Sequence, residues 1–270
     1  MFALLGVQIK IISDKINLES LVFYRCFLGS FLIFFIILFQ MKKITINGFA
    51  TNNLLVQILR ALVGICAMYM GYNAITMIPL ALASTISFTK IFFVTFLSMI
   101  FFKENFKIKI LFLSLFGFFG VILIINPTAE FTNRTGVYLS IFSAFFVGIG
   151  IVLTSFLTKK NKTFTIIFYH SLFSLVFSVL FFFEKIEKIS WDQFLVVLIF
   201  TITALLGQYF NVESYKGKKA SVTVLFSYSR IIFSFLFGYF LFDETFSKLT
   251  LFGLTMIIIS TISIKKLVNS

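Results

Sequence analysis

The chain has 270 residues, of which 60% are hydrophobic, 19% aromatic and 12% charged, and its mean hydropathy is +1.06. A soluble domain is nearer half apolar and a quarter charged, so this composition excludes a soluble globular protein and indicates an integral membrane protein. The formal net charge of +13 does not point to nucleic acid, because most of the basic residues lie in short gaps between apolar runs, where they set membrane orientation.

Apolar runs divide the chain into ten segments. About 20 consecutive apolar residues are needed to cross a hydrocarbon core about 30 Å thick. Runs of this kind lie at 20–40, 53–75, 80–102, 108–126, 136–157, 164–183, 192–215, 221–242 and 248–264. A shorter run at 1–13 reaches only about 20 Å as a helix, so helix 1 is either truncated or begins upstream of Met1. The sequence therefore predicts an all-α integral membrane protein with ten transmembrane helices.

The distribution of Lys and Arg in the gaps predicts the orientation of the chain. Gaps on one side carry 13 basic residues, and gaps on the other side carry Lys15, Arg134, Lys185, Lys188 and Lys248. Cytoplasmic loops carry the excess of Lys and Arg, so both termini are predicted to be cytoplasmic. The gaps are too short to hold a soluble domain.

Paired landmarks predict an internal repeat, with residues 1–127 as the first half (helices 1–5) and 128–270 as the second (helices 6–10). Three pairs are offset by 140 residues and one by 145: Ser87 and Lys90 with Ser227 and Arg230, Glu104 with Glu244, Tyr69 with Tyr209, and Phe23-Tyr24-Arg25 with Phe168-Tyr169-His170. Because each half has five segments, the second half is predicted to insert in the inverted orientation. Inverted repeats are typical of secondary transporters, whose site lies near the membrane midplane.

Lys90 and Arg230 are the main candidates for a binding site. Each lies nine or ten residues into its segment, about 15 Å deep, where a charged side chain needs water or a partner. On the predicted helices Ser87 lies on the face of Lys90, and Ser227 lies on the face of Arg230. Contact with a solute is the favoured interpretation, and a structural base satisfied by carbonyls or hydroxyls is the alternative.

Four further charged or titratable residues are candidates for gating, coupling or substrate contact. Arg60 is interpreted as a gate or structural residue, with substrate contact as the alternative. Arg25 is expected to extend its side chain to the outer membrane surface. His170 is interpreted as a histidine satisfied within the bundle rather than a proton shuttle. Glu213 is interpreted as a partner of nearby lysines such as Lys216 rather than a carrier of a coupling proton, and proton coupling or exchange stays open.

Polar and aromatic residues on two segments are candidates to line a cavity. They are Tyr69, Tyr72 and Asn73 in the third segment and Gln208, Tyr209 and Asn211 in the eighth. Such side chains stack on or hydrogen-bond a ligand, although tyrosines also occur in interfacial belts. Glu213 is the one carboxylate well inside a segment, and it cannot neutralise four bases. A solute with a carboxylate or a phosphate is therefore favoured, and zwitterions also qualify.

Several strings resemble the EamA-type branch of the drug/metabolite transporter superfamily. They are Arg60-Ala61-Leu62-Val63-Gly64, the run 74–83, Lys103-Glu104, Asp243-Glu244 and Asn126-Pro127. The resemblance implies a secondary transporter of the bacterial inner membrane that moves a small organic solute by alternating access, with helices 5 and 10 outside the cavity. Members of this family include amino-acid and metabolite exporters and an S-adenosylmethionine uptake carrier, which is the alternative function.

Enzyme signatures are not found in the sequence. It lacks a Walker A string, and a single histidine with two isolated cysteines, Cys26 and Cys66, does not make a metal site. Ser87-Phe88-Thr89-Lys90 matches S-x-x-K, but its companion strings are missing. No cofactor is expected, and the predicted partners are a small solute and membrane lipid. A membrane-embedded enzyme and a non-transporting scaffold are the alternatives from other classes.

Overall fold

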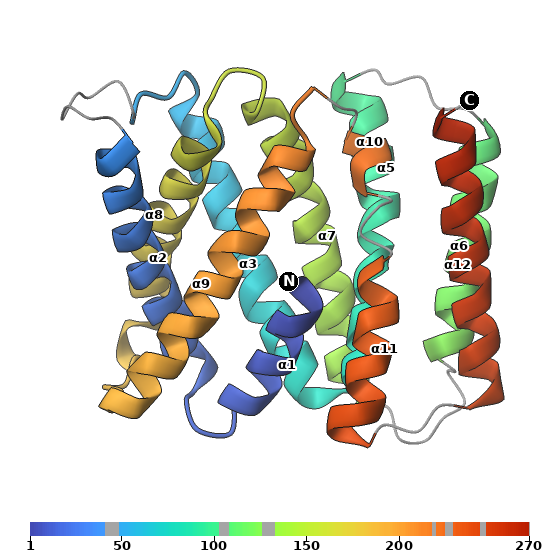
Figure 1. The fold of residues 1–270 in the computed structure, drawn as a ribbon, viewed down its shortest axis with the longest axis horizontal. Helices are drawn as coiled ribbons and strands as arrows, with labels where there is room; N and C mark the ends of the chain where they lie inside the picture. Colours follow the sequence, from blue (N-terminus) through green and yellow to red (C-terminus); the bar gives the residue numbers. More distant parts are fainter. Residues whose placement is uncertain are drawn as a thin grey trace.

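The computed structural model describes the chain apart from residues 41–48, 103–107, 126–132, 218–219, 225–228, 244–246 and 270. The described residues form helices and turns without a strand, which confirms the predicted all-α class. In chain order the elements are α1 (Phe2–Ile12), α2 (Leu18–Gln40), α3 (Leu54–Met77), α4 (Leu80–Ile86), the 3-10 helix η2 (Ser87–Thr89), α5 (Lys90–Phe102), α6 (Ile108–Ile125), α7 (Arg134–Leu157), α8 (Thr163–Phe182), the 3-10 helix η3 (Phe183–Lys185), α9 (Trp191–Ser214), α10 (Ala220–Thr223), α11 (Ser229–Phe242) and α12 (Lys248–Asn269). They stand side by side in one bundle (Figure 1).

Six stretches of the described chain are long and apolar enough to cross a membrane. They are Leu18–Phe39, Leu54–Met77, Leu80–Phe102, Arg134–Leu157, Thr163–Lys185 and Trp191–Ser214. Shorter apolar helices lie in α1, α6, α11 and α12. This composition is that of a membrane protein, whereas ten spans, an inverted arrangement of two halves and cytoplasmic termini stay predictions.

The segment predicted as one helix over 80–102 is interrupted in its middle, which corrects that expectation. The hydroxyl groups of Thr85, Ser87 and Thr89 each donate to a carbonyl oxygen three or four residues earlier, at 2.6–2.9 Å. Side chains that hydrogen-bond the local backbone in this way compete with the helical ladder. The helix tightens into η2 at Ser87–Thr89, and Lys90 becomes the first residue of α5. A 3-10 turn within a helix often marks a functional hinge.

The segment predicted over 221–242 is also divided. α10 ends at Thr223 and α11 begins at Ser229, with 225–228 outside the described residues. Arg230 is therefore the second residue of α11, as Lys90 is the first residue of α5. Both bases that the sequence analysis selected stand at the start of a half-helix.

Several helices begin at residues suited to that position. Ser190 and Gln193 form a capping box before α9, in which each side chain accepts a hydrogen bond from the other residue's backbone N–H. The Asn133 side chain accepts from the backbone N–H of Gly136 and caps α7. Pro79 precedes α4, where its missing N–H leaves no helical hydrogen bond unmade. These caps fix where the long helices start.

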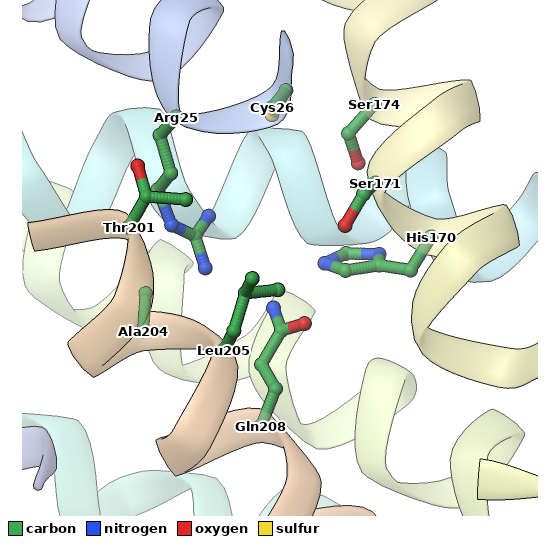
Figure 2. Close-up of a pocket in the computed structure, with 9 residues that line it drawn as sticks. All are labelled: Arg25, Cys26, His170, Ser171, Ser174, Thr201, Ala204, Leu205 and Gln208. Carbon is green, nitrogen blue, oxygen red and sulfur yellow. The ribbon is translucent and has the colours of Figure 1, made fainter. Parts of the chain in front are cut away.

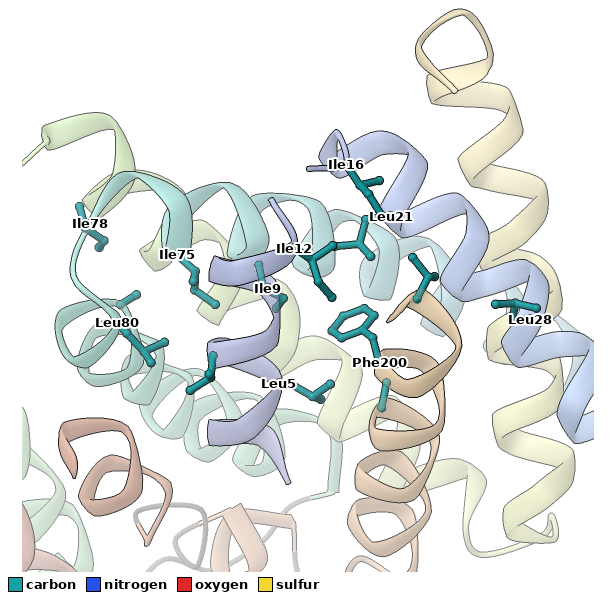
Figure 3. Packing of buried hydrophobic residues seen from close by; sticks show 14 of the residues in the cluster. Leu5, Ile9, Ile12, Ile16, Leu21, Leu28, Ile75, Ile78, Leu80 and Phe200 are labelled. Atoms are coloured by element: carbon teal, nitrogen blue, oxygen red, sulfur yellow. The ribbon is translucent and has the colours of Figure 1, made fainter. Parts of the chain in front are cut away.

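α1 has only 11 residues, but apolar contacts anchor it in the bundle. Leu5, Ile9 and Ile12 belong to a buried cluster that includes Ile75 of α3 and Phe200 of α9 (Figure 3). In a soluble protein, burying side chains of this kind contributes roughly 1.5–3 kcal/mol each. In a membrane protein, close packing between helices holds α1 in place instead. α1 runs from one end of the bundle to its centre (Figure 1).

α3 and α7 pack closely along their length because small residues meet between them. A Cβ atom on Gly71 would lie 2.7 Å from the hydroxyl oxygen of Ser143. The same hydroxyl donates to the carbonyl oxygen of Ala67 at 2.8 Å. Small residues let two backbones approach in a membrane, and hydroxyls then hydrogen-bond across the contact. The α3–α7 pair is a central wall of the bundle (Figure 1).

α6 and α12 form a pair at one edge of the bundle (Figure 1). Their backbones nearly touch at Gly120 and Gly253, where a Cβ atom on Gly253 would lie 2.4 Å from the carbonyl oxygen of Gly120. The hydroxyl of Ser260 donates to the carbonyl oxygen of Leu113 at 2.6 Å. This pair is held by a glycine contact and one hydrogen bond between helices, away from the centre of the molecule.

Candidate functional site

A cavity of about 1330 Å³ occupies the middle of the bundle. This is larger than a typical ligand pocket, which has about 300–1,000 Å³, so a solute and water fit together. Its described lining comes from α1–α5, η2 and α7–α11, and includes no residue of α6 or α12. The described residues of α6 and α12 therefore lie outside the cavity lining.

The charged lining of this cavity is entirely basic in the part of the chain that the structure describes. Arg25, Arg60, Lys90 and Arg230 all line it, together with His170, and the described lining contains no Asp or Glu. A buried charge without a counter-charge is costly in a medium of low dielectric constant. The described lining supplies no counter-charge for these bases.

Lys90 and Arg230 line the cavity from the starts of α5 and α11. Lys90 is only 8% exposed, and its ammonium lies 5.1 Å from the centroid of the Phe88 ring. The Nε atom of Arg230 is buried and has no hydrogen-bond partner among the described residues. Neither base makes an ion pair among the described residues.

Arg60 is different, because described protein groups already satisfy part of its guanidinium. Its Nε donates to the hydroxyl of Thr154 at 2.7 Å, and its Nη1 donates to the carbonyl oxygen of Ile166 at 3.3 Å. These bonds join α3 to α7 and α8. The geometry agrees with the gate or structural interpretation of Arg60 more closely than with substrate contact.

Arg25 and His170 converge on a second, much smaller cavity of about 10 Å³. Figure 2 shows the guanidinium of Arg25, the imidazole of His170 and the amide of Gln208 directed towards this space from α2, α8 and α9. The Nη1 of Arg25 donates to the sulfur of Met68. The expectation that Arg25 extends to the outer surface is therefore wrong: the side chain points into the bundle, where these groups surround it.

The remaining predicted residues divide into two groups. Ser87, Tyr72, Gln208 and Asn211 line the large cavity, whereas Tyr69, Asn73, Tyr209 and Glu213 do not belong to its described lining. Ser227 lies outside the described residues. The Asn73 amide donates to the Tyr69 carbonyl oxygen at 2.8 Å, and the Tyr209 ring packs against Phe164 with centroids 5.2 Å apart.

Glu213 makes the local ion pair that its sequence neighbourhood predicts. Its carboxylate lies 2.6 Å from the Lys216 ammonium and accepts a hydrogen bond from the Thr163 hydroxyl. This arrangement joins the end of α9 to the start of α8. Among the described residues, no three His, Cys, Asp and Glu side chains come together as a metal site.

Two features of the site were missed in the sequence. Ser140, Ser143, Gly150 and Thr154 of α7 line the large cavity, and their spacing of three, seven and four residues is a helical stripe that the sequence does contain. Glu19, at the start of α2, accepts a hydrogen bond from the Tyr69 hydroxyl at 3.0 Å and lies 3.5 Å from the Lys185 ammonium. Nothing in the sequence places Lys185 beside it.

The bundle and its cavity together define the class of protein. Apolar helices of membrane-spanning length around a large cavity with charged side chains are typical of membrane transporters. A model of the EamA-like transporter family matches residues 1–126 and 134–265. The chain belongs to the EamA-like transporter family, which confirms the resemblance found in its sequence.

Curated relatives have transporter names. The chain is 24% identical to the pseudopaline exporter of Pseudomonas aeruginosa, over 98% of this chain and 92% of the relative. It is 24% identical to the S-adenosylmethionine uptake transporter of Rickettsia conorii, over 94% and 85%. It is 25% identical to a transporter of Helicobacter pylori, over 96% and 89%. A crystal structure with a TM-score of 0.74 and 14% identity, covering 99% of this chain and 96% of its own, shows the same fold.

These findings establish the general function. The chain is a multi-pass membrane transporter, as the family and the apolar helices predict. The relatives named above are bacterial proteins with transport names rather than enzyme names.

Proposed function

We propose that the chain is a secondary transporter that moves a small organic metabolite with an anionic group, such as an amino acid or another anionic or zwitterionic solute, by alternating access. The observation that carries this proposal is the large cavity with four basic side chains and no carboxylate in its described lining. Lys90 and Arg230 are proposed as the principal contacts, because neither has an ion pair among the described residues.

Polar residues of the lining are proposed to orient the solute. Ser87 lines the cavity from η2, three residues before Lys90. Tyr72 lines it from α3, and Gln208 and Asn211 line it from α9. Hydroxyl and amide groups of this kind supply directional hydrogen bonds while the bases supply charge. A carboxylate or phosphate on the solute offsets the positive charge that the cavity concentrates.

The proposal includes two inverted halves, residues 1–127 and 128–270, and packing contacts support it. When a twofold axis relates two inverted halves, a helix close to the axis packs against the equivalent helix of the other half. The helix pairs α2 with α8 and α6 with α12 pack against each other and join equivalent positions of the repeat. The contact of α4 with α11 has its equivalent in the contact of α10 with α5. The family model also matches one stretch in each half.

Two matched hydrogen bonds add support for these halves. The Tyr24 hydroxyl of α2 donates to the carbonyl oxygen of Glu187, in the α8–α9 connection, at 3.2 Å. The Tyr169 hydroxyl of α8 donates to the carbonyl oxygen of Phe49, in the α2–α3 connection, at 2.9 Å. The sequence analysis paired these two tyrosines, and each ties its helix to the equivalent connection of the other half.

The connections on the two membrane faces provide candidate gates for alternating access. On one face the Asn17 amide donates to the carbonyl oxygen of Lys185 at 2.9 Å. On the other the Thr51 hydroxyl donates to the Asn161 side chain at 2.9 Å. We place the second face, which also holds the C-terminal end of α12 (Figure 1), in the cytoplasm because the predicted basic gaps lie there. The bacterial plasma membrane is the proposed location.

S-adenosylmethionine uptake is the second candidate, because a relative has that name. S-adenosylmethionine has a sulfonium and an ammonium against one carboxylate, so its net charge is positive near neutral pH. Four basic side chains without a carboxylate in the described lining oppose such a ligand. The charge of the cavity therefore favours an anionic metabolite.

Counterflow into proteoliposomes tests the proposed function. Vesicles with the purified full-length chain are loaded with unlabelled amino acids, organic acids, nucleotides or S-adenosylmethionine, and uptake of the labelled compound is measured. The proposal expects accumulation of at least one amino acid, organic acid or nucleotide, above the level in protein-free vesicles. Accumulation of S-adenosylmethionine alone, or of none of these compounds, would contradict it.

A further inference from the structure

The bases of the large cavity fall into two groups on opposite sides of it. Lys90 and Arg230 belong to α5 and α11, which pack against α7 and α10 and against α1 and α4 respectively. Arg25 and His170 belong to α2 and α8, which pack against each other. In Figure 1 the helices α1, α3, α7 and α9 stand between these two sets. The positive charge is therefore spread across the cavity.

The group around Arg25 contains three buried polar atoms that lack partners in the described part of the chain. They are the Nε of Arg25, the Nδ1 of His170 and the Oε1 of Gln208. Arg25 has five N–H donors. Among the described residues its Nη1 donates to the Met68 sulfur, which is a weak acceptor. His170 is 6% exposed. A buried donor left without an acceptor is destabilising, and more so when it is charged.

Water in the small cavity does not neutralise the charge of Arg25. That cavity has about 10 Å³, which holds about one water molecule. One water makes two to four hydrogen bonds, enough for the three partnerless atoms, but it brings no negative charge to offset the guanidinium. All three side chains also line the large cavity, so a group in the large cavity can reach them. Gln208 presents either its oxygen or its NH₂ after rotation of the amide.

We infer that Arg25, with His170 and Gln208, forms a second anion-binding point opposite Lys90 and Arg230, so that the solute carries two anionic groups, one for each point. This inference rests on the proposed function and narrows the substrate class to dicarboxylates and to metabolites with a phosphate and a carboxylate. A zwitterion adds no net negative charge, and a monoanion offsets one side of the cavity only. Arg60 is not counted, because Thr154 and Ile166 already bind it.

Matched solutes test the inference. The thermal stabilisation of the detergent-solubilised full chain is measured against succinate, butyrate and 4-aminobutyrate, and against 3-phosphoglycerate, glycerate and serine. Within each set the carbon chain has the same length while the net charge changes. We expect the solute with two anionic groups, succinate or 3-phosphoglycerate, to bind at least about tenfold more tightly than the monoanion or zwitterion of its set in at least one set, because it makes one more charge-assisted contact.

Variants assign this preference to Arg25. Arg25→Gln is expected to bring the ratio of dianion to monoanion affinity close to one, with monoanion affinity unchanged within about threefold. Lys188→Gln removes an exposed charge outside the cavity lining and is expected to leave the ratio unchanged. If Arg25→Gln melts below the wild type without ligand, Gln208→Leu replaces it and is expected to lower the ratio about threefold or more.

The outcomes separate this inference from the proposed function. If a monoanion or zwitterion binds as tightly as its dianion, or the ratio survives Arg25→Gln in a folded protein, the second anion-binding point is refuted and the proposed function stands. If none of the six solutes stabilises the chain, this inference is refuted, and the counterflow panel decides separately on the proposed function. A dianion preference that Arg25→Gln abolishes and Lys188→Gln preserves supports both.

Discussion

Replacement of Gly253 by Ala is expected to destabilise the contact between α6 and α12. The added Cβ would lie 2.4 Å from the carbonyl oxygen of Gly120. This oxygen belongs to the backbone, so it cannot move aside by a rotamer change as the end of a flexible side chain can. Forced overpacking costs about 1–3 kcal/mol, and the higher helix propensity of Ala returns up to about 1 kcal/mol. A net loss of about 1–2 kcal/mol is therefore expected. Unfolding in mixed micelles with increasing SDS, followed by circular dichroism, measures it.

Gly150→Ala is the matched control for this change. Gly150 lies in α7, and a Cβ atom there would have Val63 Cγ2 as its nearest neighbour at 3.8 Å, an ordinary contact. The same substitution is thus expected to be neutral or stabilising by up to about 1 kcal/mol at this position. If Gly253→Ala proves as stable as Gly150→Ala, the close glycine contact between α6 and α12 does not hold in the membrane protein.

Two further changes test contacts around the cavity. Tyr69→Phe removes the hydrogen bond to Glu19 at 3.0 Å but keeps the ring against Phe182. We therefore expect the free energy of unfolding in SDS to fall by about 1 kcal/mol, with unchanged solute affinity. A large loss of affinity would place Tyr69 at the site instead. Arg60→Met removes two buried hydrogen bonds and is expected to destabilise the chain by about 1.5–3 kcal/mol. Unchanged stability would show that Arg60 has no structural role and serves only to contact the solute.

The positions of the helices could be predicted from the sequence with good accuracy. The apolar runs at 53–75, 164–183 and 192–215 correspond to α3, α8 and α9 within two residues, because membrane-spanning helices need long stretches of apolar side chains. The interruption at Ser87–Thr89 could not be predicted in this way. It depends on which hydroxyls hydrogen-bond their own backbone, and hydropathy does not report that choice.

The candidate site could be predicted in part. Charges in an apolar helix stand out whatever face they occupy, so Lys90, Arg230 and Arg60 were found, and all three line the cavity. The inward face of each helix was harder to assign, because lipid tails are as apolar as the packed interior and leave a weak periodic signal. Tyr69 and Tyr72 are one turn apart in α3, yet only Tyr72 belongs to the described lining.

Arg25 illustrates a different limit of the sequence. Its distance from the end of its segment favoured a side chain that extends to water, but the direction depends on the neighbouring helices. α8 and α9 bring His170 and Gln208 to the same space as Arg25 (Figure 2). These residues lie more than 140 positions further along the chain, and no local pattern joins them.

The central claim, that Lys90 and Arg230 bind the solute, is tested most directly by the initial rate of counterflow in the double variant Lys90→Gln, Arg230→Gln. The solute is the one that the wild type accumulates, and Lys188→Gln is the control for loss of positive charge outside the cavity lining. We expect the double variant, reconstituted with normal folding, to lose at least about 90% of the rate, as removal of one charge-assisted contact lowers affinity tenfold or more. A rate equal to that of Lys188→Gln would contradict the claim.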